Sequence, residues 1–299
     1  MNSGNKVTYG NHLFPWIPEL YIRENEYRHT KQEVHENIKQ ALIEWFSSQN
    51  PDSIFSQVAE RFDLTKQDEV TLSFMNYGNT ELVYLAAIGE KVKLATLINQ
   101  PHTVLGKVKK EFNYLQRLTQ IDPLHVVEPF AYFINNNLTY EMYASEYIDN
   151  ALCIAHLNGH GIYNPLPQYH FERFSNEMSQ NIKTNIISLL VNYYDQEQWE
   201  WLAKIEVSGS DFLLTRKFNH EDPGTIQDNI KIIWARNSIK TSLDEYLDIL
   251  RKEFTRGTYR NGKELVNYRS EEAMTPKEIE KGIELWLLLR EKQVIQGKT

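Results

Sequence analysis

The sequence predicts an α+β fold in which an antiparallel five-stranded sheet with one helix precedes a mainly helical region. Between residues 69 and 149, five short runs combine apolar alternation with Gly- or Asn-containing breaks, as antiparallel strands do. One stretch of helical period separates the third run from the fourth. After residue 149 the longer apolar patterns have a helical period instead.

The composition is typical of a folded chain with a large core. The 299 residues are 41% apolar and 24% charged, enough for two lobes and an appendage. The net charge of −8 argues against general nucleic-acid binding. Cys153 is the only cysteine, which excludes an internal disulfide framework and is typical of a reducing compartment.

No apolar run reaches the length of about 18 residues that a membrane span needs, and the polar amino terminus has no signal-peptide core. We therefore expect no membrane association and a cytoplasmic location. Delivery into another cell by a dedicated secretion route would leave no mark in the sequence.

Residues 1–66 have the pattern of a helical extension. Thr30 and Glu33 have the spacing of a capping box, in which each side chain satisfies a free backbone N–H. The apolar stripe that follows predicts a helix to about residue 46. After a break at 50–53, a second helix is expected over 54–62.

The central region carries the strands. They are expected over 70–74, 82–88, 91–98, 126–133 and 138–143. A helix is expected over 104–118, because Val108, Phe112, Leu115 and Leu118 recur at helical spacing.

The second half of the sequence predicts several helices and few strands. After a brief helical start at residue 152, helices are expected over 171–194, 241–254 and 275–291. Short apolar strands are expected over 212–214 and 230–233, and a polar loop over 256–262.

The order of three strands, one helix and two strands over 69–149 resembles the small lobe of the protein-kinase-like superfamily, especially its aminoglycoside and choline phosphotransferase branch. The resemblance implies a bilobal fold that binds ATP and magnesium in a cleft between lobes. Its parts would be the extension over 1–66, an antiparallel five-stranded small lobe over 67–148 and a mainly helical large lobe over 149–299.

The resemblance also implies nucleotide-binding residues in the small lobe. Gly78 and its neighbours resemble a degenerate nucleotide-covering loop. Lys93 is similar to the third-strand lysine, and Glu111, 18 positions later, to the helix glutamate that holds it. Glu146 and Ile148 lie in the stretch that resembles the hinge between lobes.

The identity of the lysine has alternatives. Strand alternation places Lys91, Lys93 and Ala95 on one face. If Ala95 occupies the family's lysine position, the phosphate anchor is weakened. A further alternative is that Lys93 and Glu111 both lie on solvated faces, where these residue types usually occur.

The catalytic loop departs from the family's residues. Where the family has an aspartate followed five positions later by an asparagine, this chain has Glu206 and Asp211. Glu206 would accept the proton of the attacking hydroxyl, and Asp211 would bind magnesium. Lys204 stands where the family has a histidine.

The second magnesium ligand has two candidate positions. In one register Asp222 supplies it, 11 residues after Asp211. In the other, the strand over 230–233 aligns with the family's preceding strand and Trp234 occupies the turn, which leaves no carboxylate there. We favour Asp222, because catalysis requires a carboxylate.

Two functions follow. The first is a phosphotransferase that binds ATP and magnesium and phosphorylates an unknown small-molecule or protein acceptor. The second is a pseudokinase, a kinase-shaped binding module whose altered loop no longer transfers phosphate. A third possibility is an α+β protein unrelated to kinases.

Overall fold

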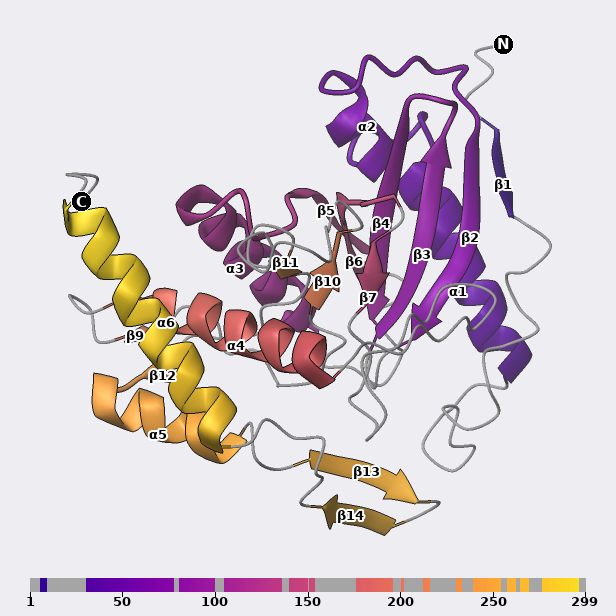
Figure 1. The fold of residues 1–299 in the computed structure, drawn as a ribbon. Coiled ribbons are helices and arrows are strands. Elements are labelled where there is room, and N and C mark those ends of the chain that lie inside the picture. Colours follow the sequence, from indigo (N-terminus) through magenta and orange to yellow (C-terminus); the bar gives the residue numbers. More distant parts are fainter. Residues whose placement is uncertain are drawn as a thin grey trace. The chain divides into compact units, whose positions relative to one another are not determined.

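The computed structural model describes residues 6–9, 31–77, 81–99, 105–135, 140–149, 151–153, 176–195, 200–201, 212–215, 230–232, 239–253, 257–261, 264–268 and 276–295. The chain divides into two compact units. The first comprises Met1–Gln116 and Val127–Tyr147, and the second Arg117–Val126 and Ile148–Thr299. Both units contain helices and strands (Figure 1), so the mixed α and β character expected from the sequence is confirmed. In the described ranges no helix is both long and apolar enough to cross a membrane.

The first unit is built on a six-stranded sheet with the order β1-β2-β3-β4-β6-β5 (Figure 1). The strands are β1 (Val7–Tyr9), β2 (Val70–Tyr77), β3 (Glu81–Ile88), β4 (Val92–Asn99), β5 (Pro129–Asn135) and β6 (Tyr140–Glu146). Neighbouring strands from β2 to β5 are antiparallel. The five expected strands are therefore present.

The expectation of only five strands in this sheet was wrong, because β1 adds a sixth. It pairs in parallel with the start of β2, where Val70 N–H donates to Lys6 O at 2.9 Å. The Thr8 hydroxyl donates to Val70 O at 3.3 Å. A strand of three residues is too short to show a recognisable alternation, and its partner lies about 60 residues further along the chain.

Helices α1 (Lys31–Phe46) and α2 (Ile54–Ala59) pack on one face of this sheet. Trp45 of α1 is fully buried, and its ring lies 5.2 Å from that of Phe133 in an edge-to-face contact. Ser53 caps α2, since its hydroxyl oxygen accepts the N–H of Ser56 at 3.0 Å. Both helices were expected from the apolar stripes and the break between them.

Helix α3 (Lys107–Ile121) lies against the opposite face. Its residue Phe112 contacts the rings of Tyr132 and Tyr143, at centroid distances of 5.8 and 6.1 Å. Tyr143 is paired with Leu97 of β4. Because side chains alternate along a strand, the α3 face of β4 carries Lys93, Ala95, Leu97 and Asn99.

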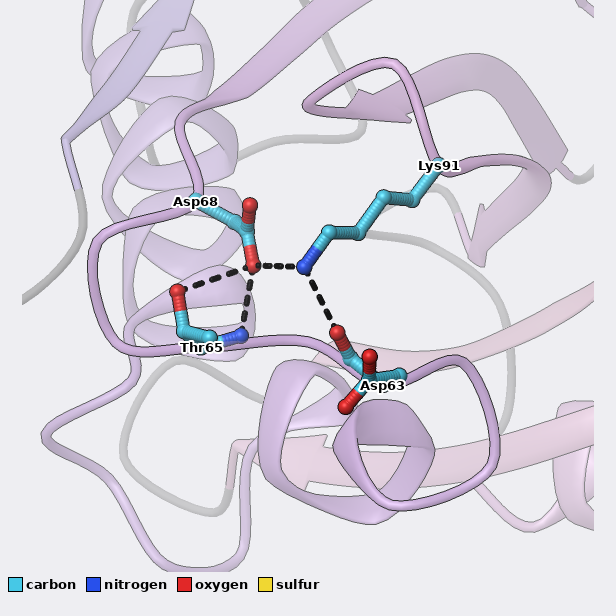
Figure 2. Close-up of polar contacts among 4 residues, drawn as sticks. All are labelled: Asp63, Thr65, Asp68 and Lys91. Carbon is cyan, nitrogen blue, oxygen red and sulfur yellow. Dashed lines mark hydrogen bonds and ion pairs between the residues drawn. The ribbon is translucent and has the colours of Figure 1, made fainter.

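The turn between β3 and β4 is fastened by an ion pair (Figure 2). Lys91 Nζ lies 3.0 Å from Asp68 Oδ2 and donates to Asp63 O at 2.6 Å. The same Asp68 oxygen accepts the main-chain N–H and the hydroxyl of Thr65, at 2.5 and 3.1 Å. Gly89 completes the turn with a φ of +54°, a conformation that costs glycine little.

The second unit contains α4 (Asn176–Asn192), α5 (Leu243–Glu253) and α6 (Pro276–Ile295). The second half of helix α4, from Ile182 to Val191, is largely buried. Gly282 lets α6 approach it closely, because a Cβ at this position would lie 2.6 Å from Ile187 Cβ and 2.9 Å from Thr184 O. Tyr246 of α5 is also fully buried and donates its hydroxyl to Leu190 O at 2.6 Å.

The second unit also contains short strands. They are β7 (Leu152–Cys153), β8 (Tyr194–Asp195), β9 (Glu200–Trp201), β10 (Phe212–Leu214), β11 (Ile230–Ile232), β12 (Ile239–Lys240), β13 (Gly257–Asn261) and β14 (Glu264–Tyr268). They form the sheets β11-β10-β7, β12-β9-β8 and β13-β14. The expected strands near 212–214 and 230–233 are confirmed.

Two expectations in this unit were wrong. Residue 152 begins a strand instead of a helix, because Leu152 and Cys153 pair with β10 about 60 residues away. Residues 257–261 form one arm of a hairpin instead of a loop (Figure 1), pairing in full register with 264–268. The two residues between these strands have the length of a tight hairpin turn, a signal that the polar composition of the segment obscured.

Candidate functional site

Lys93 lies near the start of β4, on the sheet face that α3 covers, and its side chain is exposed. Its Nζ lies 5.9 Å from the centroid of the Tyr147 ring, within reach of a cation–π contact. Tyr147 directly follows β6, so the lysine and the stretch expected to form a hinge lie together. Lys91, which alternation grouped with Lys93, precedes β4 and is bound to Asp68 instead.

Glu111 lies on the apolar stripe of α3, together with Val108, Phe112 and Leu115, and is only 1% exposed. Its Oε1 accepts the hydroxyl of Tyr143 at 3.4 Å. The alternative placed both Lys93 and Glu111 on solvated faces, and for Glu111 it was therefore wrong, whereas the exposure of Lys93 is as that alternative expects. A carboxylate buried to this degree needs nearby donors or a cation to compensate its charge.

Glu146 ends β6, where it is paired with Leu94. Its N–H donates to Glu128 O at 2.8 Å, and its side chain is partly exposed. Ile148 is also partly exposed, and its carbonyl accepts the N–H of Ala151 at 3.3 Å in a turn. Lys93, Tyr147 and Glu146 thus surround one end of the β4–β6 pair.

The remaining predicted site residues lie outside the described part of the chain. They are Gly78, Glu206, Asp211 and Asp222, and the same holds for Lys204 and Trp234. Their roles, including magnesium binding by Asp211 and Asp222, stay predictions. Within the ranges that the structure describes, no three His, Cys, Asp or Glu side chains converge as metal ligands.

A second set of polar contacts surrounds the start of α3, and it was not expected from the sequence. Glu141 of β6 is 1% exposed, and its Oε1 accepts the N–H of Gly106 at 2.7 Å and the hydroxyl of Tyr132 at 2.9 Å. Its Oε2 accepts the N–H of Val108 at 3.2 Å. Burial, followed by the hydrogen bond to Glu141, raises the pKa of Tyr132 above its usual value, which keeps this phenol a hydrogen-bond donor.

The second unit contains a separate acid–histidine pair. Asp122 Oδ2 lies 2.7 Å from His125 Nδ1 and accepts the hydroxyl of Tyr193 at 3.0 Å. Burial raises the pKa of Asp122, but the hydrogen bonds from His125 and Tyr193 outweigh it and leave the pKa below its ordinary value. Burial and the charge of Asp122 raise the pKa of Tyr193.

We assign this pair a structural role. The second ring nitrogen of His125, Nε2, is buried. The cluster joins the segment after α3 to the end of α4, because Tyr193, which bonds to Asp122, is the first residue after that helix.

Sequence reasoning missed Glu141, Asp122 and His125. A signal for Glu141 was available, because it is the only charged residue between Tyr140 and Ser145 and alternation places it on the Tyr143 side of the strand. Asp122 and His125 are three residues apart in a segment without clear periodicity, so no local pattern indicated their contact.

No protein-family model matches this chain, and no curated protein matches it. Its function therefore has to be inferred from its own residues.

Proposed function

We propose that this protein is a kinase-like phosphotransferase that binds ATP and magnesium. The observation that supports the proposal most is the burial of Glu111 on α3, against the sheet face that also carries Lys93. A helix carboxylate directed at the sheet is what the predicted lysine–glutamate pair requires.

In this proposal each predicted residue has one role. Lys93, held by Glu111, neutralises charge on the nucleotide phosphates. Glu146 and Ile148 contact the base, and Gly78 covers the phosphates. Glu206 accepts the proton of the attacking hydroxyl, while Asp211 and Asp222 bind magnesium through oxygen, the ligand that this ion prefers.

The test is thermal denaturation of the full chain with magnesium alone and with magnesium plus ATP. A nucleotide present at about 100 times its dissociation constant stabilises the folded state by about 2.7 kcal/mol. We therefore expect the melting temperature to rise by about 5 °C or more. No rise at millimolar ATP would contradict the proposal.

Two neighbouring lysines provide a matched pair of variants. Lys93→Met removes the proposed phosphate anchor, whereas Lys91→Met removes an equal charge from the surface pair with Asp68. We expect the ATP-induced rise to be lost in Lys93→Met and retained in Lys91→Met. Equal loss in both would mean that general charge, and not a site, attracts the nucleotide.

The second candidate is a pseudokinase that binds nucleotide or a protein partner without phosphate transfer. Lys204 in place of a histidine, and Asp211 in place of an asparagine, favour it. It predicts that no acceptor is phosphorylated and no ATP is consumed, whether or not ATP raises the melting temperature. Magnesium-dependent turnover that is lost in Glu206→Gln would favour the active enzyme.

A further inference from the structure

We propose that Glu141 is a positioning residue that sets the place of α3 on the sheet, and thereby the place of Glu111. The effect of Glu141 on nucleotide binding rests on the proposed function. The inference that it holds α3 rests on the contacts of Glu141 alone.

Helix α3 has no cap of its own. Gly106 occupies the N-cap position, because its carbonyl accepts the N–H of Lys110 at 3.1 Å, and glycine has no side chain to bind the free N–H groups. The first turn contains Lys107, Lys109 and Lys110 and no acidic residue. Positive side chains at the positive end of the helix dipole disfavour a helix start here.

Glu141 supplies what this start lacks. Its two carboxylate oxygens accept the N–H groups of Gly106 and Val108. An N-cap side chain would otherwise bind the N–H of Val108, and the third helical residue of a capping box would bind that of Gly106. Its negative charge also lies at the positive end of the helix dipole. A residue of the sheet therefore performs the capping that the helix sequence does not.

The sheet holds Glu141 firmly. Strand β6 lies between β4 and β5, so it is hydrogen-bonded on both sides. The main-chain N–H of Glu141 donates to the side chain of Asn99 at 2.6 Å, and Tyr132 of β5 donates to its carboxylate. The main chain of Glu141 is thus fixed by β4 and β5, and its carboxylate by Tyr132 of β5.

Val108 transmits this position to Glu111. The two residues lie three positions apart on the buried stripe of α3, so the capped turn leads directly to the glutamate. A slip of α3 by one residue would turn Glu111 by about 100° around the helix axis and remove it from the sheet. The bonds from Gly106 and Val108 to one carboxylate define a single register.

The decisive variant is Glu141→Gln, which keeps the size of the side chain and removes its charge and one acceptor. Glu128→Gln is the matched control, because Glu128 lies near β5 in an exposed pair with Arg61. Ile98→Val is a second control that lowers stability from the other face of the sheet. Hydrogen exchange of α3 and the dissociation constant for ATP with magnesium are measured on full-length proteins.

In Glu141→Gln we expect the amides of α3 to exchange about tenfold faster, while those of α1 change little. We expect ATP binding to weaken by about tenfold, because the charged acceptor at the helix start is lost. Glu128→Gln should leave both quantities within about twofold, and Ile98→Val should leave ATP binding within about twofold despite its lower stability.

Each outcome tests a different part of the proposal. Unchanged α3 exchange in Glu141→Gln would overturn the positioning role. Faster exchange with unchanged ATP affinity would show that Glu141 holds α3 without acting on the nucleotide site. Absence of ATP binding in the unmodified protein would overturn the proposed function, while the exchange data would still decide whether Glu141 holds α3.

Discussion

Asp68 and Glu141 are two carboxylates of the first unit that bind similar donors in different surroundings. Each accepts a main-chain N–H and a hydroxyl. Asp68 also has a cation, Lys91, whereas the donors to Glu141 in the described structure are all uncharged. The side chain of Asp68 is 16% exposed and that of Lys91 39%, while Glu141 is 1% exposed.

The difference shows that burial decides how much such a group contributes. Water can replace the lost partners of Asp68, and an exposed ion pair contributes little. The donors around Glu141 have no such replacement, so each would remain unsatisfied if the carboxylate were removed. The buried carboxylate, whose donors are uncharged, should therefore matter more to the fold than the ion pair that Figure 2 shows.

The largest effect is expected for Glu141→Ala. It leaves two N–H groups and one hydroxyl without an acceptor, and we expect it to lower the free energy of unfolding by about 3 kcal/mol. Chemical denaturation monitored by circular dichroism measures this change. Glu128→Ala is the control, with an expected loss of no more than about 1 kcal/mol. Equal losses in the two variants would contradict the comparison.

A smaller effect is expected for Tyr132→Phe. The variant removes the phenol donor but leaves Glu141 bound to the N–H groups of Gly106 and Val108. We expect a loss of about 1 kcal/mol, the usual contribution of one hydrogen bond. The same denaturation experiment tests it. A loss as large as that of Glu141→Ala would mean that Tyr132, and not the helix start, depends on the carboxylate.

The smallest effect is expected for Asp68→Asn, and it should depend on pH. The N–H of Thr65, followed by Lys91, lowers the pKa of Asp68 from its ordinary value of 3.8. The stabilisation is therefore complete above that value and is lost as the pH falls through the lowered pKa. The melting temperature of the unmodified protein should exceed that of Asp68→Asn at neutral pH, and this difference should shrink in acid.

Thermal melts of both proteins between about pH 2 and pH 7 measure this difference. High salt should reduce it at neutral pH, because exposed charges are screened. A difference that stays constant across the pH range would show that the carboxylate charge contributes nothing.

Local patterns in the sequence were enough to locate the strands from β2 to β6 and helix α3. Val108, Phe112, Leu115 and Leu118 recur at helical spacing, and all four are buried as expected. Such patterns involve only residues within a few positions of each other, which is why the sequence reveals them. The burial of Glu111 on the sheet side of α3 was decided by the structure, because the sequence left a solvated face open for this residue.

Contacts between distant segments were not predictable in this way. Lys91 was grouped with Lys93 by alternation, yet it binds Asp68, 23 positions earlier. Strand β1 escaped detection because three residues carry too little periodicity. The β13–β14 hairpin escaped because its polar residues indicated a loop.

The sequence by itself determined which segments are helices and strands in the central region, since each segment's own spacing of apolar residues sets its structure. Only the tertiary structure decided how α3 begins. Gly106 and the three lysines that follow provide no cap, and the carboxylate that completes the helix lies 35 positions away on β6. That contact depends on how the sheet brings distant residues together, because a free N–H group requires an acceptor but does not specify which residue supplies it.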